Sequence, residues 1–152
     1  MTWAHASPSL TNESLYRLIS WFSPSFPIGA YSYSRGLETA IEKGFVNNQT
    51  DLVDWIDTDL SHGPGWTDAI FFALVFRAVN SADDNELFYL AEVAHALRGS
   101  AELELESTSQ GKAFVRAISE SWSLPKVEIF QQQLNARDVE ITLPVAAAVS
   151  CA

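Results

Sequence analysis

The fold class depends on residues 102–122, ELELESTSQGKAFVRAISESW. The first five residues alternate between acidic and apolar side chains, as in a strand with one buried face. From Leu103 onward, however, small or apolar side chains recur every three or four residues, at Ser107, Gly111, Phe114, Ile118 and Trp122. This spacing predicts one long helix. Small residues at 107 and 111 would allow another helix to approach its buried stripe closely, although glycine lowers helix propensity by about 1 kcal/mol.

Helical spacing of apolar residues recurs on both sides of this segment. Asp83 and Glu86 resemble a capping box, Thr50 suits a helix N-cap, and SHGPG at 61–65 should separate two helices. The apolar run AIFFALVF at 69–76 predicts a central helix that anchors the core. Further helices are expected near residues 13–22, 37–43, 126–135 and 144–152. The sequence therefore predicts an all-α, compact single domain over residues 1–152, with about seven or eight helices.

The composition excludes several classes of protein. A formal net charge of −10 argues against unaided binding to nucleic acid or anionic membranes, and favours basic protein partners. Cys151 is the only cysteine, and the first ten residues contain neither a basic start nor an apolar signal core, so we expect an intracellular, cytoplasmic protein. The longest apolar run is far shorter than the roughly 20 residues that span a bilayer.

No pattern for catalysis or metal binding stands out. The sequence has no GxSxG elbow, no phosphate-binding loop and no histidines or cysteines paired at ligand spacing, so we assign no catalytic residue and no metal ligand. Asp59 and His62 lie one helical turn apart and could touch one ion. A histidine placed favourably at a helix C-terminus is the preferred interpretation. The acidic residues Glu102, Glu104 and Glu106 should form a solvated side of their helix, or alternatively face a basic partner.

Residues 22–38, FSPSFPIGAYSYSRGLE, form what we call the corner segment. Pro24 and Pro27 should end the preceding helix, because proline fixes φ and lacks a backbone donor. Gly29 and Gly36 can adopt backbone geometries that other residues avoid. The corner segment is therefore predicted to be a stiff, partly buried connection between two helices.

The corner segment resembles the signature S-x-x-x-P-x-G-x-x-[ST]-x-S-x-G-L-E of the urease accessory protein F family (UreF). A second resemblance is LRGSAELELESTSQGKAF at 97–114, which is similar to an arginine, Glu-Leu, Glu and Gly series of that family. A third is ITLPVAAAV at 141–149, where the family has a Leu-Pro helix start. The three segments occur in family order. Arg35 stands where relatives often carry histidine or glutamine, and Glu104 where they often carry arginine.

The resemblance implies an all-helical, cytoplasmic, dimeric protein without catalytic activity of its own. Such proteins bridge the D/H-type urease accessory protein and the GTPase accessory protein G, in a complex that loads nickel into apo-urease. No cofactor is then expected to bind tightly, and nickel is handled by the complex. The family also continues through further helices after the Leu-Pro start, so we expect this chain to lack a C-terminal part.

The corner segment also supplies the candidate partner-binding residues, which are Tyr31, Tyr33, Arg35 and Glu38. A rigid recognition surface loses less conformational entropy on docking. An alternative is that Phe26, Ile28 and Tyr31 simply fill the gap between the first two helices, and for these apolar residues this alternative is preferred. For the whole protein, the alternative function is a generic helical adaptor for a basic protein partner, without a metal role.

Overall fold

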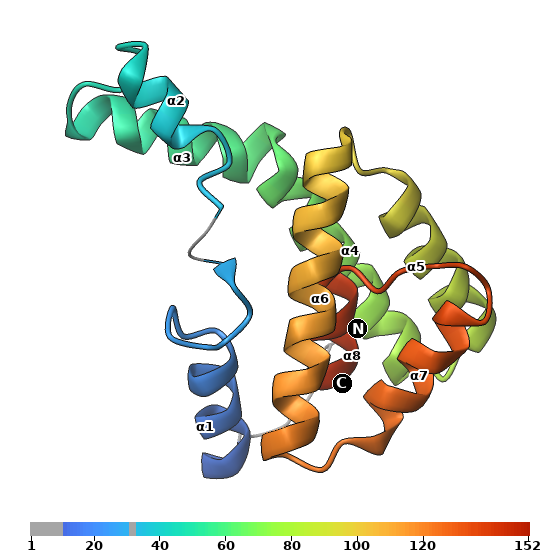
Figure 1. Cartoon of the computed structure of the whole chain (residues 1–152). Helices are drawn as coiled ribbons and strands as arrows, with labels where there is room; N and C mark the ends of the chain where they lie inside the picture. Colours follow the sequence, from blue (N-terminus) through green and yellow to red (C-terminus); the bar gives the residue numbers. More distant parts are fainter. Residues whose placement is uncertain (1–10, 31–32) are drawn as a thin grey trace, which may run out of the picture.

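The computed structural model describes residues 11–30 and 33–152. Within these ranges the chain is all-helical, which confirms the predicted fold class (Figure 1). None of the described helices is long and apolar enough to cross a membrane. The eight helices are α1 (Asn12–Trp21), α2 (Leu37–Glu42), α3 (Gln49–His62), α4 (Pro64–Asn80), α5 (Asp84–Ala96), α6 (Ala101–Ser121), α7 (Pro125–Asn135) and α8 (Leu143–Cys151).

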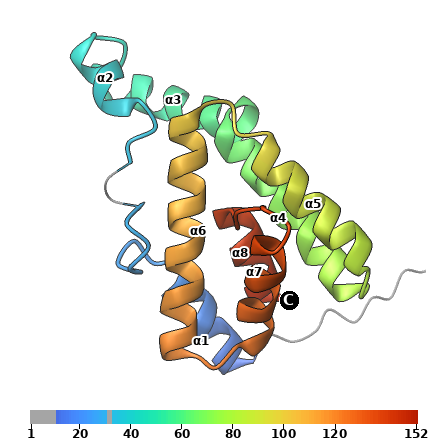
Figure 2. The ribbon, with the colours of Figure 1, turned by 45° about the vertical axis from the view of Figure 1, so that its right-hand side comes forward.

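Helix α8 lies at the centre of the core, where it packs extensively against both α4 and α6. Its residues from Pro144 to Ala148 are all buried. Helix α4 packs on α8, α5 and α3, but it is less buried than its apolar sequence predicts, since only Phe71, Val75 and Ala78 are buried. The core is therefore built around the short, alanine-rich α8, and α4 forms one of its walls (Figure 2).

The long helix α6 confirms the interpretation of residues 102–122, and ELELE lies in its first turns. A Cβ added to Gly111 would lie 2.3 Å from the carbonyl oxygen of Ile141. The Leu143 amide donates a hydrogen bond to Ser107 Oγ at 3.4 Å. The predicted close approach at residues 107 and 111 is therefore confirmed, but it is made mainly by non-helical backbone and not by the body of another helix. The approaching backbone belongs to the segment that leads into α8.

The break between α3 and α4 is shorter than SHGPG predicts. Helix α3 continues to His62, α4 begins at Pro64, and Gly63 alone caps both helices. Proline is favoured in the first turn of a helix because the amide it lacks would have no helical partner there. The N-cap of α3 is also Asn48 instead of Thr50, since the Asn48 side chain accepts hydrogen bonds from the amides of residues 50 and 51.

The corner segment crosses from α1 to α2 along α6, with aromatic contacts at its start. The Phe26 ring lies 5.3 Å from the ring of Phe114 and 6.4 Å from that of Trp122, and Ile28 also packs against the core. Both apolar residues thus pack against the core, as the preferred interpretation expects, but Phe26 does so against α6 and its C-cap instead of between the first two helices. Beyond the corner segment, α2 and the first turns of α3 extend past the end of α6 (Figures 1 and 2).

Candidate functional site

The prolines and glycines of the corner segment adopt the geometries that their types favour. Pro24 follows Ser23 in a turn that the Phe26 amide closes by donating to the Ser23 carbonyl at 3.0 Å. Gly36 has a φ of 82° and caps α2 without a side-chain hydrogen bond. This left-handed backbone is strained for any residue with a Cβ. Gly29 likewise has a positive φ, and Pro27 is exposed beside it.

The candidate partner-binding residues of the corner segment differ in their surroundings. Tyr33 and Glu38 are exposed, and Glu38 lies in the first turn of α2. Tyr31 lies outside the described residues. Arg35 instead points back toward the body of the protein. The structure thus presents Tyr33 and Glu38 to solvent and draws Arg35 into intramolecular contacts.

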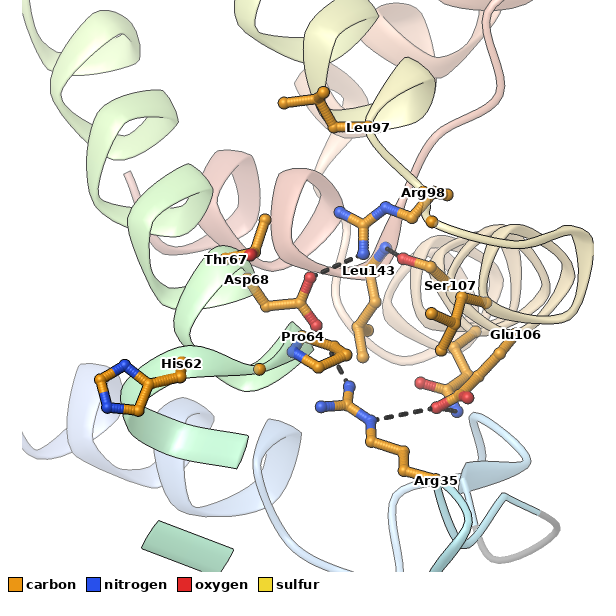
Figure 3. Close-up of a pocket in the computed structure, with 14 residues that line it drawn as sticks. Arg35, His62, Pro64, Thr67, Asp68, Leu97, Arg98, Glu106, Ser107 and Leu143 are labelled. Atoms are coloured by element: carbon orange, nitrogen blue, oxygen red, sulfur yellow. Dashed lines mark hydrogen bonds and ion pairs between the residues drawn. The ribbon is translucent and has the colours of Figure 1, made fainter. Parts of the chain in front are cut away.

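Arg35 is the centre of an ion-pair network that joins three helices, and Figure 3 shows its contacts with Asp68 and Glu106. Its Nη1 lies 3.3 Å from Asp59 Oδ2 in α3, and its Nη2 lies 3.1 Å from Asp68 Oδ2 in α4. Its Nε lies 3.5 Å from Glu106 Oε1 in α6. Arg35 itself has a positive φ of 50°, which is uncommon for a residue with a side chain. The network therefore fixes the end of the corner segment to the body.

Asp68 extends this network to a second arginine. Arg98 Nη1 lies 2.7 Å from Asp68 Oδ1, so the two Asp68 oxygens serve two different guanidinium groups. The Arg98 side chain is only 7% exposed, and its Nε donates to the Ala94 carbonyl at the end of α5. We call Arg35, Asp59, Asp68, Arg98 and Glu106 together the Arg35 cluster.

The Arg35 cluster keeps its central arginine charged. Burial disfavours the charged guanidinium, but attraction to Asp68, Asp59 and Glu106 outweighs this effect, so the pKa of Arg35 lies above its ordinary value. A guanidinium also matches carboxylates geometrically, since its donors form a planar fork. Arg35 is therefore well suited to act as a permanently charged structural residue that pairs with several carboxylates at once.

A cavity of about 270 Å³ lies beside the Arg35 cluster. Its lining includes Arg35 from the corner segment, Arg98 and Glu106 from residues 97–114, and Leu143 from residues 141–149. These belong to the three segments that carry the sequence resemblance, and Figure 3 shows their side chains gathered around one space. Segments far apart in the sequence thus converge on one candidate site.

One sequence interpretation changes at this site, and two site residues were missed. Glu106 is buried and faces Arg35, so the predicted solvated acidic side of α6 is wrong for this residue. The reason is that the corner segment packs across the helix where Glu106 points. Glu104, in contrast, is exposed and lies 3.1 Å from His95. Asp68 and Arg98 were not predicted as site residues, because no local pattern shows that their helices meet.

The site offers no grouped metal ligands. Asp59 is occupied by Arg35 and also accepts a hydrogen bond from the Gly65 amide at the start of α4. His62 lines the cavity and lies in the last turn of α3, as the preferred interpretation holds. Among residues 11–30 and 33–152, no group of three or more His, Cys, Asp or Glu side chains is placed to hold a metal ion.

Comparison with known proteins decides the family. A family model described as UreF matches residues 46–152. The chain belongs to the UreF family. The urease accessory protein UreF of Rhodopseudomonas palustris (strain BisB5) is 50% identical over 111 residues, covering 73% of this chain and 46% of the relative. The UreF of Bradyrhizobium diazoefficiens is 39% identical over 138 residues, covering 91% of this chain and 56% of the relative. The sequence-based assignment to urease accessory proteins is thus confirmed.

The corner segment lies before the stretch that the family model matches, but it is covered by a longer alignment. The urease accessory protein UreF of Bradyrhizobium sp. (strain BTAi1) is 37% identical over 148 residues, which cover 95% of this chain and 60% of the relative. An alignment of that extent includes residues 22–38. The chain spans 46% to 60% of the length of these three relatives.

Proposed function

We propose that this chain acts as a non-catalytic scaffold in urease maturation, bridging the D/H-type accessory protein and the GTPase accessory protein G. The observation that carries the proposal is the membership of the UreF family, whose relatives are named as urease accessory proteins. In this function the protein acts in the cytoplasm during GTP-dependent nickel insertion into apo-urease. Nickel is cargo of the complex and does not bind this chain tightly.

The surface of the chain supports a role in protein binding. Its formal net charge of −10 favours basic partners by long-range attraction. Exposed carboxylates gather on α2 and α3, where Glu38, Glu42, Asp54 and Asp57 all face solvent. The same region exposes apolar side chains, including Ile41, Phe45, Val53 and Ile56. Acidic and apolar groups side by side are typical of a surface that a protein partner covers.

We further propose that the protein forms a homodimer at full length, as the family resemblance implies. The chain spans about half the length of the relatives that it matches, so the oligomer is best tested on the longer protein. Light scattering on that protein should give twice the monomer mass. A monomer at micromolar concentration would contradict the homodimer and leave the scaffold proposal in place.

The alternative function is a generic adaptor for a basic protein partner without a metal role. The acidic charge alone favours it as much as it favours the scaffold. Affinity capture from a urease-positive cell separates the two functions. Joint recovery of the D/H-type and G accessory proteins supports the scaffold. Recovery of basic proteins unrelated to urease, without these two, would overturn the scaffold and favour the adaptor.

A further inference from the structure

The Arg35 cluster is a main connection between the corner segment and the body of the protein. Helix α2 buries only Ala40, and α3 buries none of its residues. Helix α2 therefore gains little stabilisation from the core, and α3 is attached to the body through its packing on α4. Arg35, two residues before α2, reaches carboxylates on α3, α4 and α6 at 3.1 to 3.5 Å. The orientation of the corner surface with Tyr33 and Glu38 thus depends on how firmly Arg35 is held.

Asp68 is the carboxylate best placed to hold Arg35. It makes the shortest of the three Arg35 ion pairs, and its other oxygen lies 2.7 Å from Arg98 Nη1. Arg98 is itself held in place, because its side chain is almost fully buried and its Nε donates a hydrogen bond to the Ala94 carbonyl of α5. Contacts therefore run without interruption from the end of α5, through Arg98 and Asp68, to Arg35.

Arg98 keeps one edge of its guanidinium without a partner. Its Nη2 is buried and makes no hydrogen bond within the described residues. Arg98 is therefore held through Nε and Nη1 alone, between the Ala94 carbonyl and Asp68. Loss of Arg98 would leave Asp68 with only Arg35 as an ion-pair partner.

We propose that Asp68 and Arg98 are positioning residues, which hold Arg35 and thereby keep the corner surface in one orientation for a protein partner. The proposal rests on the proposed scaffold function for the identity of that partner. Pre-organised surfaces bind more tightly because less conformational entropy is lost on docking. Asp68 and Arg98 would strengthen partner binding through this pre-organisation, although their own side chains are largely covered by the protein.

Hydrogen–deuterium exchange of the Asp68→Asn variant tests the positioning role directly. Several amides report on the corner and α2, because they are hydrogen bonded there: Leu37 to the Ser34 carbonyl, Ala40 to the Gly36 carbonyl, and Val46 to the Ala40 carbonyl. We expect these amides to exchange about tenfold faster in Asp68→Asn, with α7 and α8 unchanged. Asp68→Glu keeps the charge and should restore most of the protection.

Asp57→Asn is the matched control, since Asp57 is an exposed carboxylate of α3. It should exchange like the wild type. Unchanged protection of the corner in Asp68→Asn would overturn the proposal. Faster exchange across all helices would also overturn it, because Asp68 would then be a general stability residue.

Partner capture completes the test. Asp68→Asn and Arg98→Gln should each recover several-fold less of the two urease accessory proteins than the wild type, while α7 and α8 keep their wild-type protection from exchange. Lost capture with normal corner exchange would contradict positioning and indicate direct contact. Failure of the wild type to capture either protein would contradict the scaffold function, and the exchange measurement would still decide whether Asp68 positions the corner.

Discussion

Arg35 Nη2 lies 3.1 Å from Asp68 Oδ2, across a separation of 33 residues in the sequence. This contact joins the end of the corner segment to the second turn of α4. An ion pair between residues distant in the sequence holds two separate segments of the chain together. Its loss should therefore lower the free energy of unfolding more than the loss of an exposed ion pair does.

Arg35→Gln should lower the free energy of unfolding by about 1–2 kcal/mol, less than a fully buried pair because the Arg35 side chain is 33% exposed. The change removes the cation that three carboxylates share and leaves them facing one another. The remaining repulsion should be screened by salt, so Arg35→Gln should regain part of its stability in 0.5 M salt, on the order of tenths of a kcal/mol.

Urea unfolding at low and high salt measures this effect. Arg116→Gln is the control, because Arg116 is exposed on α6. Equal stability losses for the two variants would show that the Arg35 cluster contributes no more than an ordinary surface charge.

Gly111→Ala should destabilise the protein by about 1–3 kcal/mol, as overpacking in a filled core does. The added Cβ would meet the backbone of residues 141–143, which cannot move aside as a side chain end could. Gly99→Ala is the matched control, since a Cβ there meets no atom within 4 Å. Thermal unfolding distinguishes the two variants, and a Gly111→Ala protein as stable as Gly99→Ala would refute the close approach of α8.

Phe26→Ala should cost about 2 kcal/mol, somewhat less than truncation of a fully buried phenylalanine. The ring contacts Phe114 and Trp122, so its removal opens a gap between the corner segment and α6. Phe45→Ala should have little effect, because Phe45 is 70% exposed. Urea unfolding provides the comparison. Similar free energies of unfolding for Phe26→Ala and Phe45→Ala would mean that Phe26 does not anchor the corner segment.

The Cys151 thiol should react slowly at neutral pH, because burial raises its pKa to about 11 from the ordinary value of 9.0. Only the thiolate is nucleophilic, so the rate of alkylation should rise with pH and reach half its plateau near the raised value. Iodoacetamide labelling followed by mass spectrometry gives the rate profile. In urea, which unfolds the protein, the midpoint of the pH–rate profile should return toward 9.0. A midpoint near 9.0 in the folded protein would contradict the burial of the thiol.

Glu38→Gln should leave the melting temperature within about 4 °C of the wild type, because an exposed first-turn carboxylate is worth only about 0.3 to 1 kcal/mol. Urease activation in cells should fall, since the corner carboxylate is proposed to face a partner. Glu128→Gln is the control, as Glu128 is also an exposed first-turn glutamate, in α7. Normal activation by Glu38→Gln and Glu38→Ala, in the full-length protein, would return Glu38 to a purely local role.

The helices were predictable because their apolar residues repeat locally, as from Leu103 to Trp122 in α6. The close approach at Gly111 was predictable for the same reason, since a small residue on a buried stripe implies a neighbour. The Arg35 cluster was not predictable, because its residues come from the corner segment, α3, α4, the end of α5 and α6, whose meeting depends on the whole fold. Glu106 illustrates the limit: its neighbours in the sequence indicate a solvated helix face, and the chain that covers it lies 71 residues away.

The position of α8 between α4 and α6 has a consequence for protein synthesis. The ribosome makes α4 and α6 first, and the residues that fill the space between them are translated only later. Until residues 141–148 have left the ribosome, the nascent chain exposes the apolar faces that α8 will cover. Because transiently exposed apolar surface drives aggregation, the nascent chain is most prone to aggregate during this interval. Slow codons between α6 and α8 would prolong that vulnerable interval.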